Sequence, residues 1–119
     1  MSLFDLIAAG DGEGLREALE ANPELAGERN DAGLSLVLFA LSHGRSDLVE
    51  PILDANPPLD VFDAAAVGRT RGLEELLEAD PALVASRSPD GATPLELALR
   101  FGQEDAAKIL RERGATPPG

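Results

Sequence analysis

The sequence predicts an all-α fold made of four repeated helix-turn-helix units, and three observations support this prediction. Residues 3–57 align without a gap on residues 61–115 at a constant offset of 58, which is the mark of a repeat architecture. Four glycines, spaced by 34, 24 and 34 residues, divide the chain further into four units. They are Gly10, Gly44, Gly68 and Gly102. Apolar residues recur at helical spacing within the units, as in Leu15, Ala18 and Leu19.

Each unit is expected to hold two short helices, the first of which ends at the glycine with a positive φ. The predicted first helices are Leu3–Ala9, Ser35–His43, Asp60–Val67 and Thr93–Phe101. The predicted second helices are Gly12–Ala21, Ser46–Ala55, Thr70–Ala79 and Glu104–Arg113. Because helix pairs this short cannot bury their apolar faces alone, neighbouring units should stack into one domain. This domain spans residues 1–119, with units of about 1–30, 31–57, 58–88 and 89–119.

The connections between helix pairs are predicted from turn residues and spacing. Long loops are expected at Ala26–Leu34 and Val84–Ala92, which contain the turn sequences Asp-Ala-Gly and Pro-Asp-Gly. The shorter step of 24 residues predicts a tight turn at residues 56–58 in place of a third loop. Pro51 falls inside a predicted second helix. It either kinks that helix or is tolerated near the first turn.

Composition limits the setting of the protein. The chain has 119 residues, 44% of them hydrophobic, with four Phe and no Trp or Tyr, so a core of Leu, Ala, Val and Ile is expected. The lack of cysteine excludes disulfides and thiolate chemistry and favours a cytoplasmic location. No apolar run is long enough for a membrane span, and the N-terminus does not resemble a signal peptide. Nine arginines against one lysine, with abundant Ala and Leu, suggest a bacterial source.

The chain is strongly acidic, with a net charge of −12. Residues 1–60 carry −9 of this charge and residues 61–119 carry −3. Such a chain repels phosphate backbones, so binding to nucleic acid is not expected. The acidic N-terminal half either serves solubility or steers a basic partner toward the protein.

The last unit resembles an ankyrin repeat. Residues 90–102 follow the family pattern of a turn glycine, a T-P-L-H-x-A-A box and a second glycine, and residues 107–115 follow its closing L-L-x-x-G-A. Thr93 suits a helix cap and Pro94 a first helical turn. Glu96 stands where the family usually has the His that ties neighbouring loops, which predicts a slightly looser last loop. The other three units keep the glycines but lack the full box.

The resemblance implies an ankyrin-repeat solenoid of four helix-turn-helix units with two short β-hairpin loops. Such proteins bind a partner protein through hairpin tips and the concave face of the first helices. An aromatic residue beside an arginine, as at positions 100 and 101, fits the composition of binding hot spots. The aromatic ring could instead fold back over the end of the core. Mapped onto this chain, the partner-binding residues are Arg29, Asp31, Leu34, Ser42, His43, Val67, Arg87, Asp90, Arg100 and Phe101.

No residue pattern indicates catalysis, a cofactor or a metal. His43 is the only histidine, and a lone His makes a poor metal site. The acidic pairs at 74–75 and 104–105 lie on predicted helices, where adjacent residues do not converge. Gly10–Gly14 lacks the Lys-Ser/Thr ending and the preceding strand of a phosphate loop. We therefore expect a protein without enzymatic activity.

Two alternatives remain open from the sequence. The chain could be an accessory or inhibitory subunit that docks on an enzyme through its acidic N-terminal half, in which case binding should weaken steeply with salt. A monomer is expected, although the apolar last helix could be covered by end-to-end self-association, by a longer natural chain or by the chain's own tail at residues 115–119.

Overall fold

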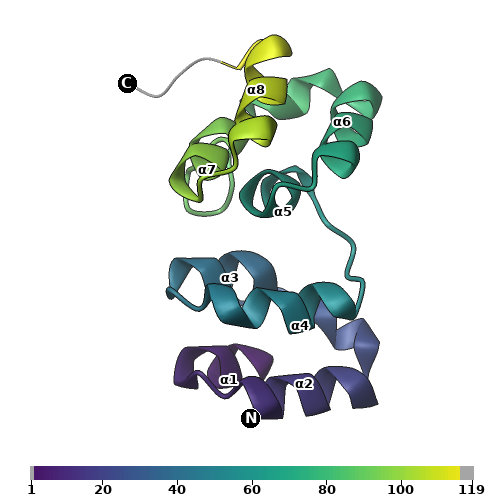
Figure 1. Cartoon of the computed structure of the whole chain (residues 1–119), viewed down its shortest axis with the longest axis vertical. Helices are drawn as coiled ribbons and strands as arrows, with labels where there is room; N and C mark the ends of the chain where they lie inside the picture. The colour runs from purple at the N-terminus through teal and green to yellow at the C-terminus, as the bar shows by residue number, and fades with distance from the viewer. Residues whose placement is uncertain (1, 116–119) are drawn as a thin grey trace. The chain divides into compact units, whose positions relative to one another are not determined.

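The computed structural model describes residues 2–115, and all regular structure in this range is helical (Figure 1). The predicted all-α class is therefore confirmed. The predicted tail beyond Ala115 lies outside the described residues. The elements in chain order are α1 (Leu3–Ala9), α2 (Gly12–Ala21), η1 (Pro23–Gly27), α3 (Leu36–Ser42), η2 (Ser46–Leu48), α4 (Val49–Asp54), α5 (Val61–Val67), α6 (Thr70–Ala79), η3 (Pro81–Ala85), α7 (Pro94–Arg100) and α8 (Glu104–Glu112), where η marks a 3-10 helix.

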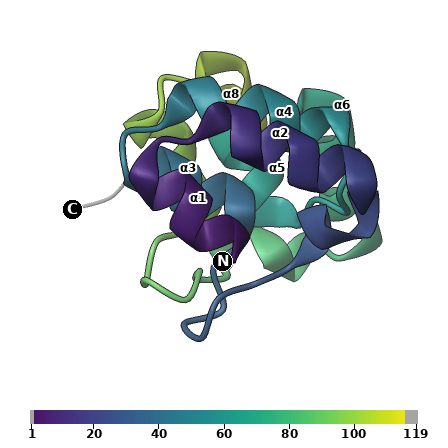
Figure 2. The ribbon, with the colours of Figure 1, turned by 90° about the horizontal axis from the view of Figure 1, so that it is seen from below.

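The chain divides into two compact units, unit 1 (Met1–Pro58) with α1–α4 and unit 2 (Leu59–Gly119) with α5–α8. Within unit 1, α1 packs on α2 and α3, while α4 packs on α2 and α3. Unit 2 repeats this arrangement with α5 on α6 and α7, and with α8 on α6 and α7. In each unit the two first helices therefore form one layer and the two second helices another, as Figures 1 and 2 show for unit 1.

The two units repeat each other almost element for element. Helices α5, α6, η3 and α7 have the same bounds as α1, α2, η1 and α3 when 58 is added to each residue number. The units differ at their last helix, because α8 begins at Glu104 whereas α4 begins only at Val49, after the 3-10 turn η2. Pro51 explains this difference. A proline excludes an α-helical turn before it, so the α-helix begins just ahead of it and Pro51 occupies its first turn.

The helix ends follow the capping residues. The four repeat glycines all adopt the predicted positive φ, between 69° and 75°. Thr93 is the N-cap of α7, which confirms the predicted cap, and Ser35 and Asp60, which the sequence placed inside helices, are N-caps as well. Each side chain accepts a hydrogen bond from the backbone N–H three residues later. A capping oxygen of this kind satisfies a donor that has no partner within the helix.

Each core is made of leucine, isoleucine, valine and alanine from all four helices of its unit. In unit 2, the buried cluster consists of Val61, Ala64, Ala65, Leu73, Leu77, Leu95, Ala98, Ala106, Ala107 and Leu110. The repeat also extends to burial: Ile7, Leu15 and Ile52 in unit 1 are fully buried, as are the residues 58 positions later. Alanines on α5 and α7 leave room for these two helices to pack closely.

The prediction of two β-hairpins is wrong for the described residues. Residues 2–115 contain no β-strand, and the only strand-like pairing among them is one isolated bridge between Arg29 and Ser35. The reason is the length of the connection. Eight residues separate η1 from α3, and eight separate η3 from α7. A five-residue turn, at residues 30–34 and 88–92, takes up most of each connection. Too little extended chain remains to form the two paired strands of a hairpin. The connection between α4 and α5 is shorter still, with six residues and a turn at Asn56, whose N–H donates to the Leu53 carbonyl.

Positions 11 and 69 correspond in the repeat but differ in helix capping, and this difference predicts the effect of two substitutions on stability. The carboxylate of Asp11 caps α2 by accepting the Gly14 N–H at 2.9 Å, whereas its counterpart Arg69 gives α6 no side-chain cap. We expect Arg69→Asp to raise the free energy of unfolding by about 1 kcal/mol, because it supplies this bond and favours the helix dipole. Asp11→Ala should lower it by about the same amount. Urea titrations followed by circular dichroism measure both, and an unchanged midpoint for Arg69→Asp would contradict the capping argument.

Candidate functional site

The two long loops are closed by the same set of hydrogen bonds. In unit 1, the Asn30 N–H donates to the Leu34 carbonyl at 3.0 Å, and the Gly33 N–H donates to the Asn30 carbonyl at 2.9 Å. In unit 2, the N–H groups of Ser88 and Gly91 make the corresponding bonds at 2.8 Å. Both loops are therefore five-residue turns of one conformation, which we call the loop tips (residues 29–34 and 87–92).

Side chains reinforce each loop tip from within. The Asn30 carboxamide oxygen accepts the Leu34 N–H at 2.9 Å. In unit 2, the Ser88 hydroxyl oxygen accepts the Ala92 N–H at 3.2 Å and the hydroxyl donates to the Asp90 carboxylate. These bonds hold both turns without help from another molecule.

An arginine closes each loop tip from the outside. The guanidinium of Arg29 donates to the Gly33 carbonyl at 3.0 Å, and that of Arg87 donates to the Gly91 carbonyl at 2.8 Å. The two glycines have φ values of 86° and 89°. An L side chain rarely adopts this left-handed conformation, so both positions require glycine.

In unit 2, two ion pairs connect the loop tip to helix α7. Arg87 lies 3.9 Å from the Glu96 carboxylate, and Arg100 lies 3.9 Å from the Asp90 carboxylate. All four side chains are at least partly exposed, so each pair adds little stability. Their effect is positional, because each places a loop-tip side chain next to α7, Arg87 beside Glu96 and Asp90 beside Arg100. Glu96 is itself an attachment point for the loop, through its contact with Arg87.

The predicted residues at the ends of the first helices differ in exposure. Ser42, His43 and Arg100 are exposed, while Val67 and Phe101 are half-buried. The N–H of Phe101 donates to the Leu97 carbonyl and closes α7. The Phe101 side chain is therefore partly exposed, and it is not buried in the core.

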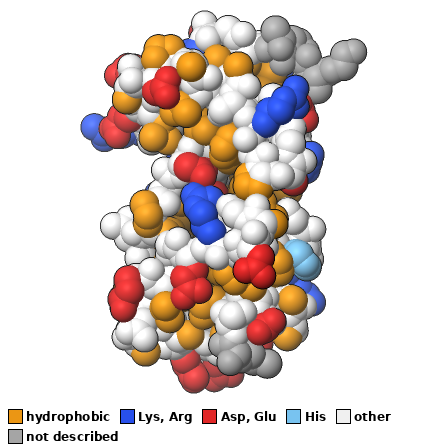
Figure 3. All heavy atoms as spheres, turned by 180° about the vertical axis from the view of Figure 1, so that it is seen from behind, with side chains coloured by type: hydrophobic (Ala, Val, Ile, Leu, Met, Phe, Trp, Pro, Cys, Tyr) orange, Lys and Arg blue, Asp and Glu red, His pale blue; other side chains and the backbone are white. Residues whose placement is uncertain are grey.

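His43 belongs to an aromatic stack on unit 1. Its ring lies 4.1 Å from that of Phe39 at an interplanar angle of 28°, and Phe39 meets Phe4 edge to face at 5.1 Å. The His43 Nδ1 is 2.9 Å from the Phe39 carbonyl oxygen, which can only accept, so Nδ1–H is the donor. The histidine nevertheless remains at the surface, where Figure 3 shows it in pale blue.

The predicted residues do not form one continuous site in unit 1. Arg29, Asp31 and Leu34 lie before α3, whereas Ser42 and His43 lie at its far end. Helix α3 has seven residues, so the two groups lie at opposite ends of a helix about 10 Å long. The structure therefore gathers Arg87, Asp90 and Arg100 in unit 2 but leaves two separate groups in unit 1.

Sequence reasoning missed several surface features. Leu99 on α7 is the one large hydrophobic side chain that is exposed among the described residues, at 42%, and it adjoins Arg100. The ring contacts of Phe39 were also missed, although its spacing of four from His43 was a signal. Unit 1 also has a surface groove that is bordered by acidic side chains, and nothing in the sequence indicated it.

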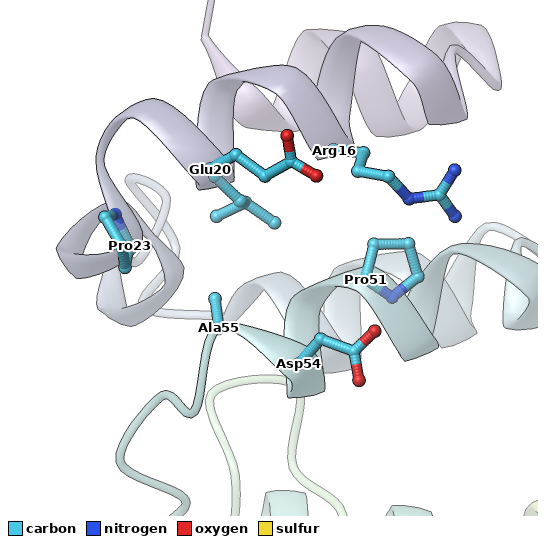
Figure 4. A pocket seen from close by; sticks show the side chains of 7 residues that line it. Arg16, Glu20, Pro23, Pro51, Asp54 and Ala55 are labelled. Atoms are coloured by element: carbon cyan, nitrogen blue, oxygen red, sulfur yellow. The ribbon is translucent and has the colours of Figure 1, made fainter.

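This groove is open, has a volume of about 340 Å³ and lies between α2 and α4 (Figure 4). Apolar side chains form part of its wall, and three charged side chains border it. The lining residues are Arg16, Leu19, Glu20, Pro23, Pro51, Asp54 and Ala55. Figure 4 shows Arg16 and Glu20 on α2, facing Pro51 and Asp54 on α4.

Residues 2–115 contain no group of three or more His, Asp or Glu side chains placed to hold a metal ion. None of the helices in this range combines the length and apolar character needed to cross a membrane. No protein-family model matches the chain, and no curated protein is significantly similar to it.

The loop geometry predicts opposite effects for one substitution at two glycines. Gly91→Ala should lower the free energy of unfolding by about 1–2 kcal/mol, because alanine is strained at this φ. Gly72 lies in helix α6 with open space around the position of a Cβ atom. Gly72→Ala should therefore raise the free energy of unfolding by about 0.5–1 kcal/mol. Thermal and urea unfolding measure both variants, and shifts in the same direction would refute the assigned loop conformation.

Proposed function

We propose that this chain is a non-enzymatic protein-interaction module of the ankyrin-repeat type. It binds a partner protein through the loop tips and the exposed ends of the first helices. The observation that supports this proposal most strongly is the repeated loop tip, with the same hydrogen bonds and the same arginine closure in both units. A surface loop that is held in shape before binding loses little conformational entropy on association. The protein is a monomer in this proposal, and its composition favours the bacterial cytoplasm.

Unit 2 offers the best-defined contact surface. Asp90 and Arg100 are joined by an ion pair beside the exposed Leu99 and the half-buried Phe101. Binding hot spots are enriched in arginine and in aromatic residues that become desolvated in the complex. A partner that covers this surface would desolvate the Asp90–Arg100 pair and the apolar side chains next to it.

A charge reversal with a matched control tests this surface. The full chain, immobilised, would first capture its partner from a lysate of the source organism. Arg100→Glu combined with Phe101→Ala should then weaken binding of the purified partner by about 10- to 100-fold, the effect of losing a hot-spot pair. Arg71→Glu is the control, since Arg71 is also an exposed helical arginine of unit 2 paired with a carboxylate, Glu75.

Calorimetric titration of the purified partner gives the affinity of each variant. We expect Arg71→Glu to change the dissociation constant by less than about twofold, as surface ion pairs contribute little. If the two variants weaken binding equally, or if neither does, the proposed surface is not the binding site. Circular dichroism of each variant separates loss of binding from loss of folding.

A second candidate function rests on charge. The N-terminal half, residues 1–60, carries a net charge of −9. Figure 3 shows acidic side chains spread over the visible face of unit 1. The chain would then be an accessory or inhibitory subunit that docks on a basic surface of an enzyme. For this function, raising the salt from 50 to 300 mM should weaken the same complex by at least about tenfold, because salt screens exposed charges. A change below about threefold would favour the loop-tip surface.

A further inference from the structure

The repeat allows each surface position of unit 1 to be compared with its counterpart in unit 2. In unit 2, the guanidinium of Arg113 lies 3.5 Å from the carboxylate of Glu78, which links the end of α8 to α6. The residues 58 positions earlier are Ala55 and Glu20. Both of these line the groove between α2 and α4. An alanine methyl group cannot reach or neutralise a carboxylate, so unit 1 keeps the acid and lacks a cation at this position. Its nearby cation is Arg16, which stands where unit 2 has Glu74.

The groove therefore has an unmatched negative charge on its border. Glu20 on α2 and Asp54 on α4 are both exposed, and no ion pair within 4.0 Å joins either of them to another residue in the described range. Arg16 is the only cation of the lining, so two carboxylates face one guanidinium. Figure 4 shows Glu20 and Asp54 on the two helices that border the groove.

The rest of the lining suits the aliphatic part of a long side chain. Leu19 and Pro51 are buried below the surface of the groove, and Pro23 and Ala55 complete its apolar part. An arginine or lysine side chain can cover apolar surface with its methylene groups while its charged end stays in water. A guanidinium has the further advantage that its planar donors match carboxylate oxygens.

We propose that the groove between α2 and α4 binds an arginine or lysine side chain from a basic segment of another protein. The cation lies between Glu20 and Asp54, and the methylene groups pack on Leu19 and Pro51. The bound cation takes the role that Arg113 has in unit 2. This site is independent of the loop tips and does not require the function proposed above.

Charge decides between the possible occupants. Two copies of this chain, each with a net charge of −12, repel one another, whereas a basic partner is attracted. A nucleic acid is repelled for the same reason. The apolar wall and the acidic border together therefore favour a basic protein segment over a second copy.

The test uses the full chain, labelled with ¹⁵N, and a short capped peptide that carries two arginines among leucines and alanines. A control peptide has citrulline, the neutral analogue, at both arginine positions. We expect amide shift changes to concentrate at residues 16–20 and 52–55, and the citrulline peptide to bind at least about fivefold more weakly, as expected when a charged group loses its partner. Shifts that concentrate at the loop tips, or the absence of any binding at millimolar peptide, would overturn the proposal.

Two matched double variants separate the site from general charge attraction. Glu20→Gln with Asp54→Asn removes two charges at the groove, and we expect at least about fivefold weaker binding of the arginine peptide. Glu17→Gln with Glu50→Gln removes two exposed charges from the same helices outside the groove lining. This control should change affinity by less than about twofold. If both double variants weaken binding of the arginine peptide equally, the attraction comes from the overall charge of the chain, and the proposed site is refuted.

A third variant supplies the missing cation from the chain itself. Ala55→Arg places in unit 1 the residue that unit 2 has at position 113, and we expect it to abolish peptide binding while circular dichroism and the unfolding midpoint are retained. Unchanged peptide affinity in this folded variant would overturn the proposal. So would dimerisation of the wild-type chain in sedimentation that Ala55→Arg removes, since the occupant would then be a second copy. Arg100→Glu with Phe101→Ala should leave peptide affinity unchanged, so this site and the loop-tip surface can fail separately.

Discussion

The burial of apolar side chains between short helices is the interaction on which the rest of each unit depends. The first helices have only seven residues each, about half the length at which an isolated helix is stable in water. They persist because Leu15 and Ile52, or Leu73 and Leu110 in unit 2, are fully buried against them and their partners. The loop tips and the groove are held in place by this packing, because both are bordered by helices that would not form alone.

Repetition gives the chain two versions of one structure, and the differences between them are informative. The first three α-helices of each unit have identical bounds at an offset of 58, which shows that the backbone tolerates many substitutions on the surface. Where the copies differ at the surface, the difference changes chemistry and leaves the fold intact. Both copies have a hollow at this place, but in unit 1 it holds Ala55 beside two carboxylates, whereas in unit 2 it holds Arg113, which pairs with Glu78. Likewise Glu96 ties a loop to its helix, and its counterpart is the buried Leu38.

The accuracy of the sequence-based predictions follows from the range of the interactions involved. Helix positions and glycine turns were predicted well, because periodicity and positive φ depend on residues within one or two turns. The predicted helix starts at Ser35 and Asp60 were displaced by one residue, since a capping residue and a first helical residue look alike in a sequence. Thr93 was recognised as a cap because a proline follows it. The predicted hairpins were wrong because turn residues do not reveal how much extended chain remains on either side.

The sequence by itself determined the repeat, the all-helical class, the turn glycines and the uneven charge, because each of these is a property of composition or of local spacing. Only the tertiary structure decided which distant side chains meet. The pairing of Asp90 with Arg100, the partial burial of Phe101 and the groove between α2 and α4 all depend on helix packing. Such contacts require side-chain positions within a few ångströms, and neither periodicity nor composition carries that information.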